Sequence, residues 1–469
     1  MKLLSSARRT LLGDKVFYKT VLALVVPVII QSTVTNFVSL LDNLMVGALG
    51  TAEMSGVAIA NQLLFIFNLA VFGGLSGAGI FGAQFFGAGD IGGLRNTFRI
   101  KLMESLILFG LAATTFLLVG PQLITMFLQG EGEAEMAEQM LANSNTYLRI
   151  SIIGLLPFAV SQCYSGTLRE MGETRMPMLA SIAAVCTNAL FNYLLIFGKF
   201  GFPCMGVAGA ATATVLSRFV ELFILVFAAH RHSDRFTFLQ GAFRTFRVPT
   251  SLLKDVVRMG LPLLLNELLW SMGISTLTAV YSRCSLTVVG ALSITSTITN
   301  LFNVVHLSMG TAVSIMVGQA LGADDNDRAL STTWKLAFFS FLCAVCMGLL
   351  LILASPYVTG IYTGVTADVR ETASSLLVIA ACIMPIQSFA HVAYFTLRSG
   401  GKTIITFLFD AGYTWVISVP LALLMVSVLN AGIFASYSVV EGMNLSKCVL
   451  GFILIKKGIW MQNIAKAHA

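Results

Sequence analysis

The sequence predicts an all-α integral membrane protein, with twelve transmembrane helices arranged as two parallel six-helix repeats. Three observations lead to this fold class. Of 469 residues, 57% are hydrophobic and only 11% are charged, whereas a typical soluble domain carries about 25% charged residues. The chain contains twelve long apolar runs, and several short residue patterns of its first half recur at a fixed offset in its second half.

Composition excludes most other classes of protein. So few charges cannot cover the surface of a water-soluble chain of this length, and the mean hydropathy is +0.85. The net charge of +7 comes from residues scattered between apolar runs rather than from a basic patch with aromatics, so we expect no nucleic-acid partner. No nucleophile–base pair, metal-ligand spacing or Walker A sequence is present, so we expect neither an enzyme nor a cofactor.

The apolar runs read as helices rather than as barrel strands. In hydrocarbon, backbone polar groups must be satisfied within the segment or in a closed barrel. Strands of a membrane barrel are about ten residues long and alternate in polarity, whereas these runs reach the roughly 20 residues of a spanning helix. The predicted spans are 20–45, 54–80, 102–120, 146–168, 176–198, 206–229, 259–282, 287–313, 334–354, 374–397, 403–426 and 431–455.

Lys and Arg predict the orientation. With the N-terminus inside, 23 of the 29 basic residues fall in inner segments and four fall outside. Inner loops of membrane proteins carry such an excess of positive charge. We therefore expect a multi-pass protein of the cell inner or plasma membrane with both termini in the cytoplasm.

The two halves repeat at an offset of 235 residues. Pro27 then aligns with Pro262, and Gln84 aligns with Gln319. The same offset pairs 67–68 with 302–303, 87–88 with 322–323, and 90 with 325. We expect an N-terminal lobe at 1–229, a cytoplasmic linker at 230–258 and a C-terminal lobe at 259–469. Parallel repeats of this kind place sites near the midplane of transporters, which favours a transporter over a channel or receptor.

Asp42 and Glu267 lie inside the predicted spans, and neither has a Lys or Arg within one helical turn. Placing a charged side chain at the centre of a membrane-spanning helix costs roughly 2.5–3.5 kcal/mol or more. Such residues are therefore rare and usually have a functional role. Such a carboxylate can exchange a proton or hold Na⁺ through oxygen ligands. With the offset of 235 residues, Asp42 aligns with Leu277 and Glu267 aligns with Ser32. Neither acid is therefore part of the internal repeat.

Four other charged residues in the spans are predicted to form local pairs, Arg218 with Glu221 and Glu441 with Lys447. Pro27 and Pro262 each free a backbone carbonyl and permit a bend near the start of a helix. A bend that depends on the ion state of a neighbouring acid is a plausible switch. Two pairs of polar or small residues also stand at i, i+4 spacing: Asn188 with Asn192, and Ala210 with Thr214.

Several segments together resemble the multidrug and toxic compound extrusion (MATE) transporters, in particular the bacterial NorM and DinF branches. They are 42–50 (DNLMVGALG), 82–90 (GAQFFGAGD), 167–177 (TLREMGETRMP), 206–214 (GVAGAATAT), 260–262 (GLP), 397–403 (LRSGGKT), Asp410 with Trp415 and Pro420, and 456–460 (KKGIW). The resemblance covers about residues 15–465. It implies two six-helix lobes in a V, alternating access, and export of drugs or organic cations against inward H⁺ or Na⁺.

The resemblance also implies a coupling-ion site in the N-terminal lobe, where Na⁺ is a possible occupant. Its residues would be Asp42, Asn188, Asn192, Thr214 and the carbonyl of Ala210. DinF-like relatives place a second Asp where this chain has Asn192, so the arrangement is closer to NorM. Glu267 lies in the region of the NorM C-lobe acid, whereas the helix 10 acid of that branch is missing and Gln387 is the nearest polar candidate.

The resulting hypothesis is an ion-coupled antiporter that exports cationic, amphipathic small molecules as a monomer surrounded by lipid. Its 34 Phe and 20 Met residues suit an adaptable apolar cavity. The alternative is a flippase for lipid-linked precursors, which has a related architecture but would need a strongly basic central cavity.

Overall fold

A computed structural model describes residues 11–128 and 134–468. In these ranges the regular structure is helical throughout, and twelve helices are long and apolar enough to cross a membrane. The predicted fold class of twelve transmembrane helices is confirmed. The basic residues Lys2, Arg8 and Arg9, which contributed to the predicted orientation, lie outside the described residues.

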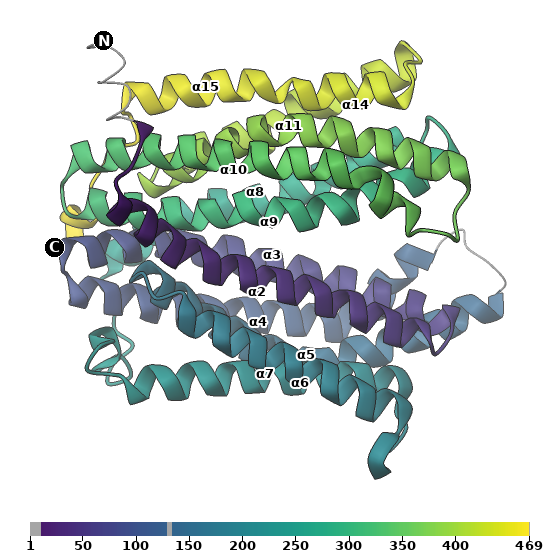
Figure 1. Ribbon diagram of the computed structural model, residues 1–469. Helices are drawn as coiled ribbons and strands as arrows, with labels where there is room; N and C mark the ends of the chain where they lie inside the picture. The colour runs from purple at the N-terminus through teal and green to yellow at the C-terminus, as the bar shows by residue number, and fades with distance from the viewer. Residues whose placement is uncertain (1–10, 129–133, 469) are drawn as a thin grey trace. The chain divides into compact units, whose positions relative to one another are not determined.

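Ten of the twelve spans are single helices (Figure 1). They are α2 (Lys15–Gly47), α3 (Thr51–Ala88), α4 (Ile91–Leu128), α5 (Ala134–Glu170), α6 (Arg175–Phe197), α7 (Gly206–Arg231), α8 (Thr250–Tyr281), α9 (Leu286–Gly322), α10 (Asn326–Gly360) and α11 (Ala367–Ser399). Each coincides with one predicted run, and most continue past its ends. Only the part of a helix inside the hydrocarbon must carry apolar side chains. The helices therefore continue past the apolar runs through turns that carry charged residues.

The last two spans are interrupted helices. The eleventh, Thr403–Val428, consists of α12 (Thr403–Phe407), η3 (Leu408–Gly412), η4 (Thr414–Ser418), α13 (Val419–Leu423) and η5 (Leu424–Val428), of which the three η segments are π-helical. The twelfth, Ile433–Lys457, breaks at Met443 into α14 (Ile433–Gly442) and α15 (Asn444–Lys457). π-Helical turns are rare and often accompany functional sites.

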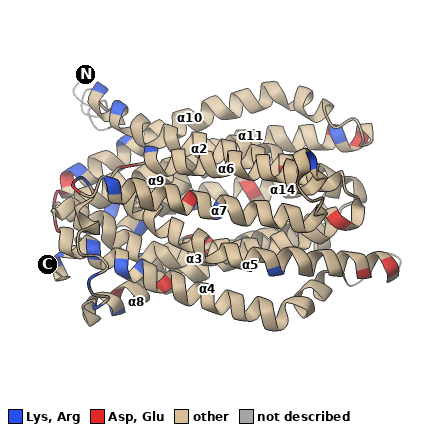
Figure 2. Cartoon of the chain, turned by 90° about the horizontal axis from the view of Figure 1, so that it is seen from below, with Lys and Arg blue, Asp and Glu red and all other residues tan. Residues whose placement is uncertain are grey.

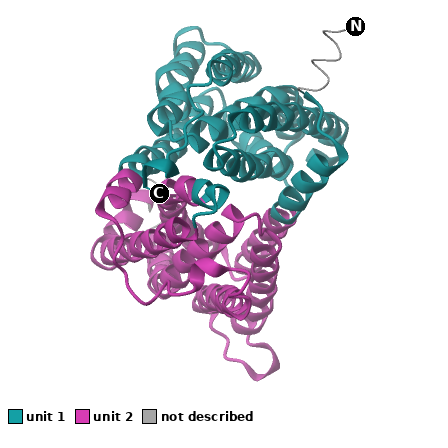
Figure 3. Ribbon diagram, turned by 90° about the vertical axis from the view of Figure 1, so that its left-hand side faces the viewer, with its two compact units in different colours: residues 1–29, 83–90, 258–469 teal, residues 30–82, 91–257 magenta. Residues whose placement is uncertain are grey.

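The chain divides into two compact units, coloured in Figure 3. Unit 1 comprises residues 1–29, 83–90 and 258–469, and unit 2 comprises residues 30–82 and 91–257. Helix α2 passes from unit 1 to unit 2 two residues after Pro27, where the proline removes one helical hydrogen bond and makes bending easier. The lobes predicted from the repeat have different boundaries and remain a prediction.

Unit 1 contains a reciprocal contact between equivalent residues of the two repeats. A side chain at Gly87 would meet the backbone of Gln319, and a side chain at Gly322 would meet the backbone of Gln84. The offset of 235 residues aligns Gln84 with Gln319 and Gly87 with Gly322. Only a residue without Cβ allows so close an approach. The repeated Gln-x-x-Gly pattern is therefore a packing device, used once by each repeat.

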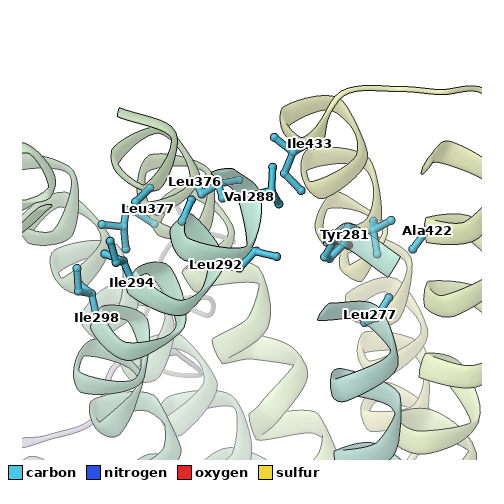
Figure 4. Close-up of a cluster of buried hydrophobic side chains, with 14 of the residues drawn as sticks. Leu277, Tyr281, Val288, Leu292, Ile294, Ile298, Leu376, Leu377, Ala422 and Ile433 are labelled. Carbon is cyan, nitrogen blue, oxygen red and sulfur yellow. The ribbon is translucent and has the colours of Figure 1, made fainter. Parts of the chain in front are cut away.

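Unit 1 also holds two clusters of buried apolar side chains. One lies where the end of α8 meets α9, α10, α11 and the last two spans, and Figure 4 shows part of it; it includes Leu277, Tyr281, Val288, Leu292, Ile294, Ile298, Leu376, Leu377, Ala422 and Ile433. The other brings Val21 and Val25 of α2 against α9, α10 and α11. These clusters fix the helices that carry the polar residues of this unit.

The predicted linker 230–258 is shorter than expected, because α7 continues to Arg231 and α8 begins at Thr250. The segment between them contains η2 (Thr237–Leu239) and is held by α4. Arg99, 8% exposed, donates to the carbonyls of Gly241 and Ala242 at 2.8 Å each. Basic residues counted as markers of orientation thus also anchor a connection.

Candidate functional site

The carboxylate of Asp42 lies near the end of α2 and is half-buried against α6. Asn192 Nδ2 donates to its Oδ1 at 2.5 Å, and Asn192 is only 1% exposed. The acid therefore has a neutral amide as a direct partner, inside a candidate membrane span. Figure 2 shows how few charged residues interrupt the middle of the helices.

Asn188 supplies a second amide to the same carboxylate. With its nitrogen facing the acid, Asn188 Nδ2 lies 2.8 Å from Asp42 Oδ1 and 3.0 Å from Oδ2, while its oxygen accepts from Thr214 Oγ1 at 3.3 Å. An ionised carboxylate is only an acceptor, and this orientation satisfies both groups. Two amides of α6 thus face one carboxylate of α2.

Helix α7 completes the group. Thr214 Oγ1 also lies 3.1 Å from the carbonyl of Ala210, four residues earlier on the same helix, so its single hydroxyl proton is shared between that carbonyl and Asn188. The structure therefore brings together all five residues of the predicted coupling-ion site: Asp42, Asn188, Asn192, Thr214 and Ala210. Their role in holding an ion remains a prediction.

One turn beyond Thr214, Arg218 makes the predicted pair with Glu221, with 3.4 Å between Nη1 and Oε2. Its guanidinium also lies 4.7 Å from the ring centre of Phe158. The site further includes Tyr147 of α5, 5% exposed, which neighbours Thr214. Sequence reasoning missed Tyr147, because a tyrosine in an apolar run gives no signal of its own.

In unit 1 the predicted pair between Glu441 and Lys447 is wrong. Lys447 Nζ instead lies 2.7 Å from Asp410 Oδ1, with side-chain exposures of 12% and 20%. Six residues along a helix correspond to about one and two-thirds turns, so positions 441 and 447 point in different directions. The break at Met443 separates them further.

Asn266 of α8 organises the irregular segment around Asp410. Its Nδ2 lies 3.2 Å from both Tyr394 Oη and Asp410 Oδ2, and its Oδ1 accepts from the backbone N–H of Ala411 at 3.1 Å. The next residue, Glu267, accepts from Tyr394 Oη at 3.3 Å. Glu267 thus belongs to a hydrogen-bonded chain that leads to Asp410 and Lys447.

Gln387 has a different acidic partner. Its Nε2 donates to Glu441 Oε2 at 2.9 Å. Glu267 and Gln387, the two residues predicted for a possible C-lobe site, have different hydrogen-bond partners. Glu267 bonds to Tyr394, and Gln387 bonds to Glu441.

Unit 2 contains a buried ion pair that the sequence analysis missed. Lys101 Nζ lies 2.6 Å from each carboxylate oxygen of Glu170 and 3.0 Å from Thr167 Oγ1, and Lys101 is 1% exposed. Lys101 falls just before the predicted span, which begins at residue 102, whereas α4 begins at Ile91. Glu104, one turn further on, has an Oε2 atom without a hydrogen bond among the described residues.

No group of three or more His, Cys, Asp or Glu in the described ranges is arranged to hold a metal ion. His306 and His391 do face each other across α9 and α11, with ring centres 5.7 Å apart. A Na⁺ ion needs hard oxygen ligands, and around Asp42 these could come only from carboxylate, amide, hydroxyl and backbone oxygens.

Comparisons with known proteins agree with this architecture. The chain is 24% identical over 449 residues to the "Probable multidrug resistance protein NorM" of Thermotoga maritima, covering 94% of this chain and 93% of that protein. It is 24% identical over 461 residues to the "Uncharacterized transporter YisQ" of Bacillus subtilis, covering 96% of each. A solved structure, described as the outward-facing conformation of a multidrug resistance MATE family transporter, has a TM-score of 0.85 at 23% identity and covers 96% of each chain.

The family comparison reproduces the internal repeat. The MatE family model matches residues 27–194 and again residues 262–424. The two matches begin at Pro27 and Pro262, the prolines that the offset of 235 residues aligns. Over both halves of its membrane-spanning region, therefore, this chain belongs to the MatE family of multi-pass membrane transporters.

Proposed function

We propose that the protein exports small organic molecules, including cationic amphipathic drugs, in exchange for inward H⁺ or Na⁺, and that Asp42 binds the ion. Membership of the MatE family supports transport, and the naming of relatives as multidrug resistance proteins supports the substrate class. The observation that carries the proposal is the Asp42 carboxylate, held inside a span by the amides of Asn188 and Asn192.

The chemistry of this group suggests how an ion could drive a conformational change. The ionised carboxylate accepts N–H bonds from α6, which tie α2 to that helix. A bound cation neutralises the acid, and the amides no longer face a full negative charge. The ligand state then alters how strongly α2 is held beside α6, and α2 can bend at Pro27. Differential binding of this kind is what a coupling ion needs in order to shift populations.

The donors around Asp42 favour a proton over Na⁺. Asn192 presents an N–H group to the carboxylate, and Asn188 does so when its nitrogen faces the acid, whereas Na⁺ would need amide oxygens turned toward it. A proton needs one carboxylate oxygen only. Na⁺ would bind this site after both amides rotate.

The flippase alternative receives less support. It requires several unpaired basic side chains in a central cavity; in the described spans Lys101, Arg218 and Lys447 each pair with an acid, and Arg169 donates to Gln31. We further propose that the protein is a monomer in the inner or plasma membrane, with both termini in the cytoplasm, as the distribution of Lys and Arg favours.

Proteoliposomes test this function. Purified protein is reconstituted, ethidium is the probe, and its movement is followed under a pure pH gradient and under a pure Na⁺ gradient. Movement against the ethidium gradient under one of the two is expected, and the pH gradient is favoured. Ethidium movement that ignores both gradients would contradict ion coupling, and no movement of ethidium or of other organic cations would contradict the substrate class.

A further inference from the structure

Glu441 is the most C-terminal acidic residue in the spans, and its hydrogen-bond partners are amides rather than the predicted Lys447. The acid is half-buried, and Gln387 Nε2 donates to its Oε2 at 2.9 Å. Asn444 Nδ2 donates to the same oxygen at 3.2 Å. No described residue donates a hydrogen bond to Oε1. One carboxylate oxygen is thus held by two neutral amides, and the other accepts no hydrogen bond from the described residues.

Its location is deep within the membrane. Glu441 stands eight residues after the start of the composite span Ile433–Lys457. At ~1.5 Å per residue this is roughly 12 Å from one end and 24 Å from the other. The acid also precedes the break at Met443, where α14 ends and α15 begins with Asn444. Interrupted helices at this depth are characteristic places for ion sites in transporters.

The charges that face Glu441 leave it without a direct counter-ion. The basic group that acts on it electrostatically is Lys447 of α15, which pairs with Asp410 of the eleventh span at 2.7 Å instead. From α8 and α14 the neighbouring titratable groups are the phenols of Tyr281 and Tyr437, which are neutral at physiological pH. At this depth the ionised form of a carboxylate without a paired cation has a high free-energy cost.

The set of groups is chemically the same as that around Asp42. Each unit contains one carboxylate, held by two side-chain amides, inside a candidate span and without a basic residue in contact. The amides around Asp42 come from α6, whereas those around Glu441 come from α11 and α15. The two groups are therefore built from different elements and cannot follow from the repeat alone.

We propose that Glu441 is a second cation-binding carboxylate, which takes up one proton or one Na⁺ with Gln387 and Asn444 as its supporting amides. The proposal extends the ion coupling proposed above from Asp42 to a site in unit 1. Gln387 then acts by positioning an acid on α14, rather than by replacing one on α11.

Labelling of the wild-type protein tests binding without relying on transport. Dicyclohexylcarbodiimide, an apolar carbodiimide, reacts with protonated carboxyl groups in apolar surroundings, and fragment mass spectra locate each adduct. Full-length protein in detergent is labelled across a pH series, with and without Na⁺. Asp410 is the matched internal control, because it lies in the same unit but is paired with Lys447.

We expect adducts on Glu441 and Asp42 that disappear as pH rises, and little on Asp410. Loss of the Glu441 adduct with rising pH alone identifies a proton site, and additional loss on adding Na⁺ at constant pH identifies a Na⁺ site. Labelling of Glu441 no greater than that of Asp410 at every pH would overturn the proposal. These outcomes hold whether or not ethidium is transported, so failure of the proposed function is distinguishable.

A transport readout then connects the site to coupling. In proteoliposomes, Glu441→Gln is expected to lower the number of cations exchanged per ethidium by one, and Glu441→Asp to keep the wild-type ratio. If Glu441→Gln does not fold, Glu441→Asp still tests the binding site, because its adduct should show the same disappearance with pH. An unchanged ratio in folded Glu441→Gln would refute a role in coupling.

Discussion

Asn192 donates a hydrogen bond to Asp42 Oδ1 at 2.5 Å, across 150 residues of sequence. The bond joins α6 to the C-terminal third of α2, the helix that crosses from unit 1 to unit 2 just after Pro27. A change in the charge of Asp42 therefore acts on a helix that both units share. This relationship motivates the first prediction.

Asp42→Asn is expected to abolish coupling while the protein still folds, because an asparagine side chain can keep hydrogen bonds to the amides of α6. Coupling free energies between two ligands typically change affinities by about 5- to 150-fold, and this factor should be lost. The measurement is gradient-driven ethidium transport by purified Asp42→Asn. Glu138→Gln, which removes an exposed acid, is the control and should behave as wild type.

Lys447→Met should destabilise the protein strongly, because it leaves the Asp410 carboxylate largely buried without its partner. Breaking one side of a buried ion pair costs roughly 3–5 kcal/mol, whereas replacing both partners with apolar residues is often nearly neutral. Thermal unfolding in detergent should therefore show a lower Tm for Lys447→Met than for Lys447→Met/Asp410→Leu. Equal losses in the two variants would mean that the ion pair does not determine the effect.

Gly87→Ala should lower Tm, because its methyl group would collide with the backbone of Gln319 in unit 1. Gly110→Ala is the matched control: it lies within α4 and has open space where the methyl group would go. In a helix interior the change from Gly to Ala is worth about 1 kcal/mol in favour of Ala. Opposite signs for the two variants are expected, and a neutral Gly87→Ala would contradict the close packing of the repeats.

Lys466 outside the spans lowers the pKa of Asp324 through a 2.7 Å ion pair and hydrogen bond, and Asp324 raises the pKa of Lys466 in return. The Asp324 contribution is present above the unfolded pKa of about 3.9 and is lost as pH falls through the lowered folded value. The Lys466 contribution is present below the unfolded pKa of about 10.4 and is lost as pH rises through the raised folded value.

The pair is fully exposed, so the Tm difference between wild type and Lys466→Met should be small and should shrink in high salt. It should be the same at about pH 5 and pH 8, since neither group titrates between those values. A difference that changes between these two pH values would show that another group controls it.

Much of the fold was predictable because the membrane imposes it. Apolar runs of spanning length can only be helices or barrel strands, so the twelve spans followed from the sequence, with ends displaced where charged turns continue a helix. Asp42 was recognisable as an isolated acid. Its partners Asn188 and Asn192 were grouped by i, i+4 spacing and by resemblance, and the structure brings them together.

Pairs between distant helices were not predictable. Nothing local indicates that Lys447 reaches Asp410, 37 residues earlier, rather than Glu441. Lys101 was misplaced because hydropathy marks the hydrocarbon boundary and not the helix start. The first error concerns which neighbour a helix face packs against, and this depends on tertiary packing that a single sequence does not reveal. The second concerns where a helix begins, which hydropathy alone does not mark.

The most direct test of ion-coupled export through Asp42 is reverse operation of the exchange. Proteoliposomes are prepared with an ethidium gradient but no pH or Na⁺ gradient, and cation movement is recorded with a pH-sensitive dye and with a Na⁺ indicator. Wild type should move protons or Na⁺ in the direction opposite to ethidium, and Asp42→Asn should move neither. Equal cation movement by wild type and Asp42→Asn would contradict the role assigned to this carboxylate.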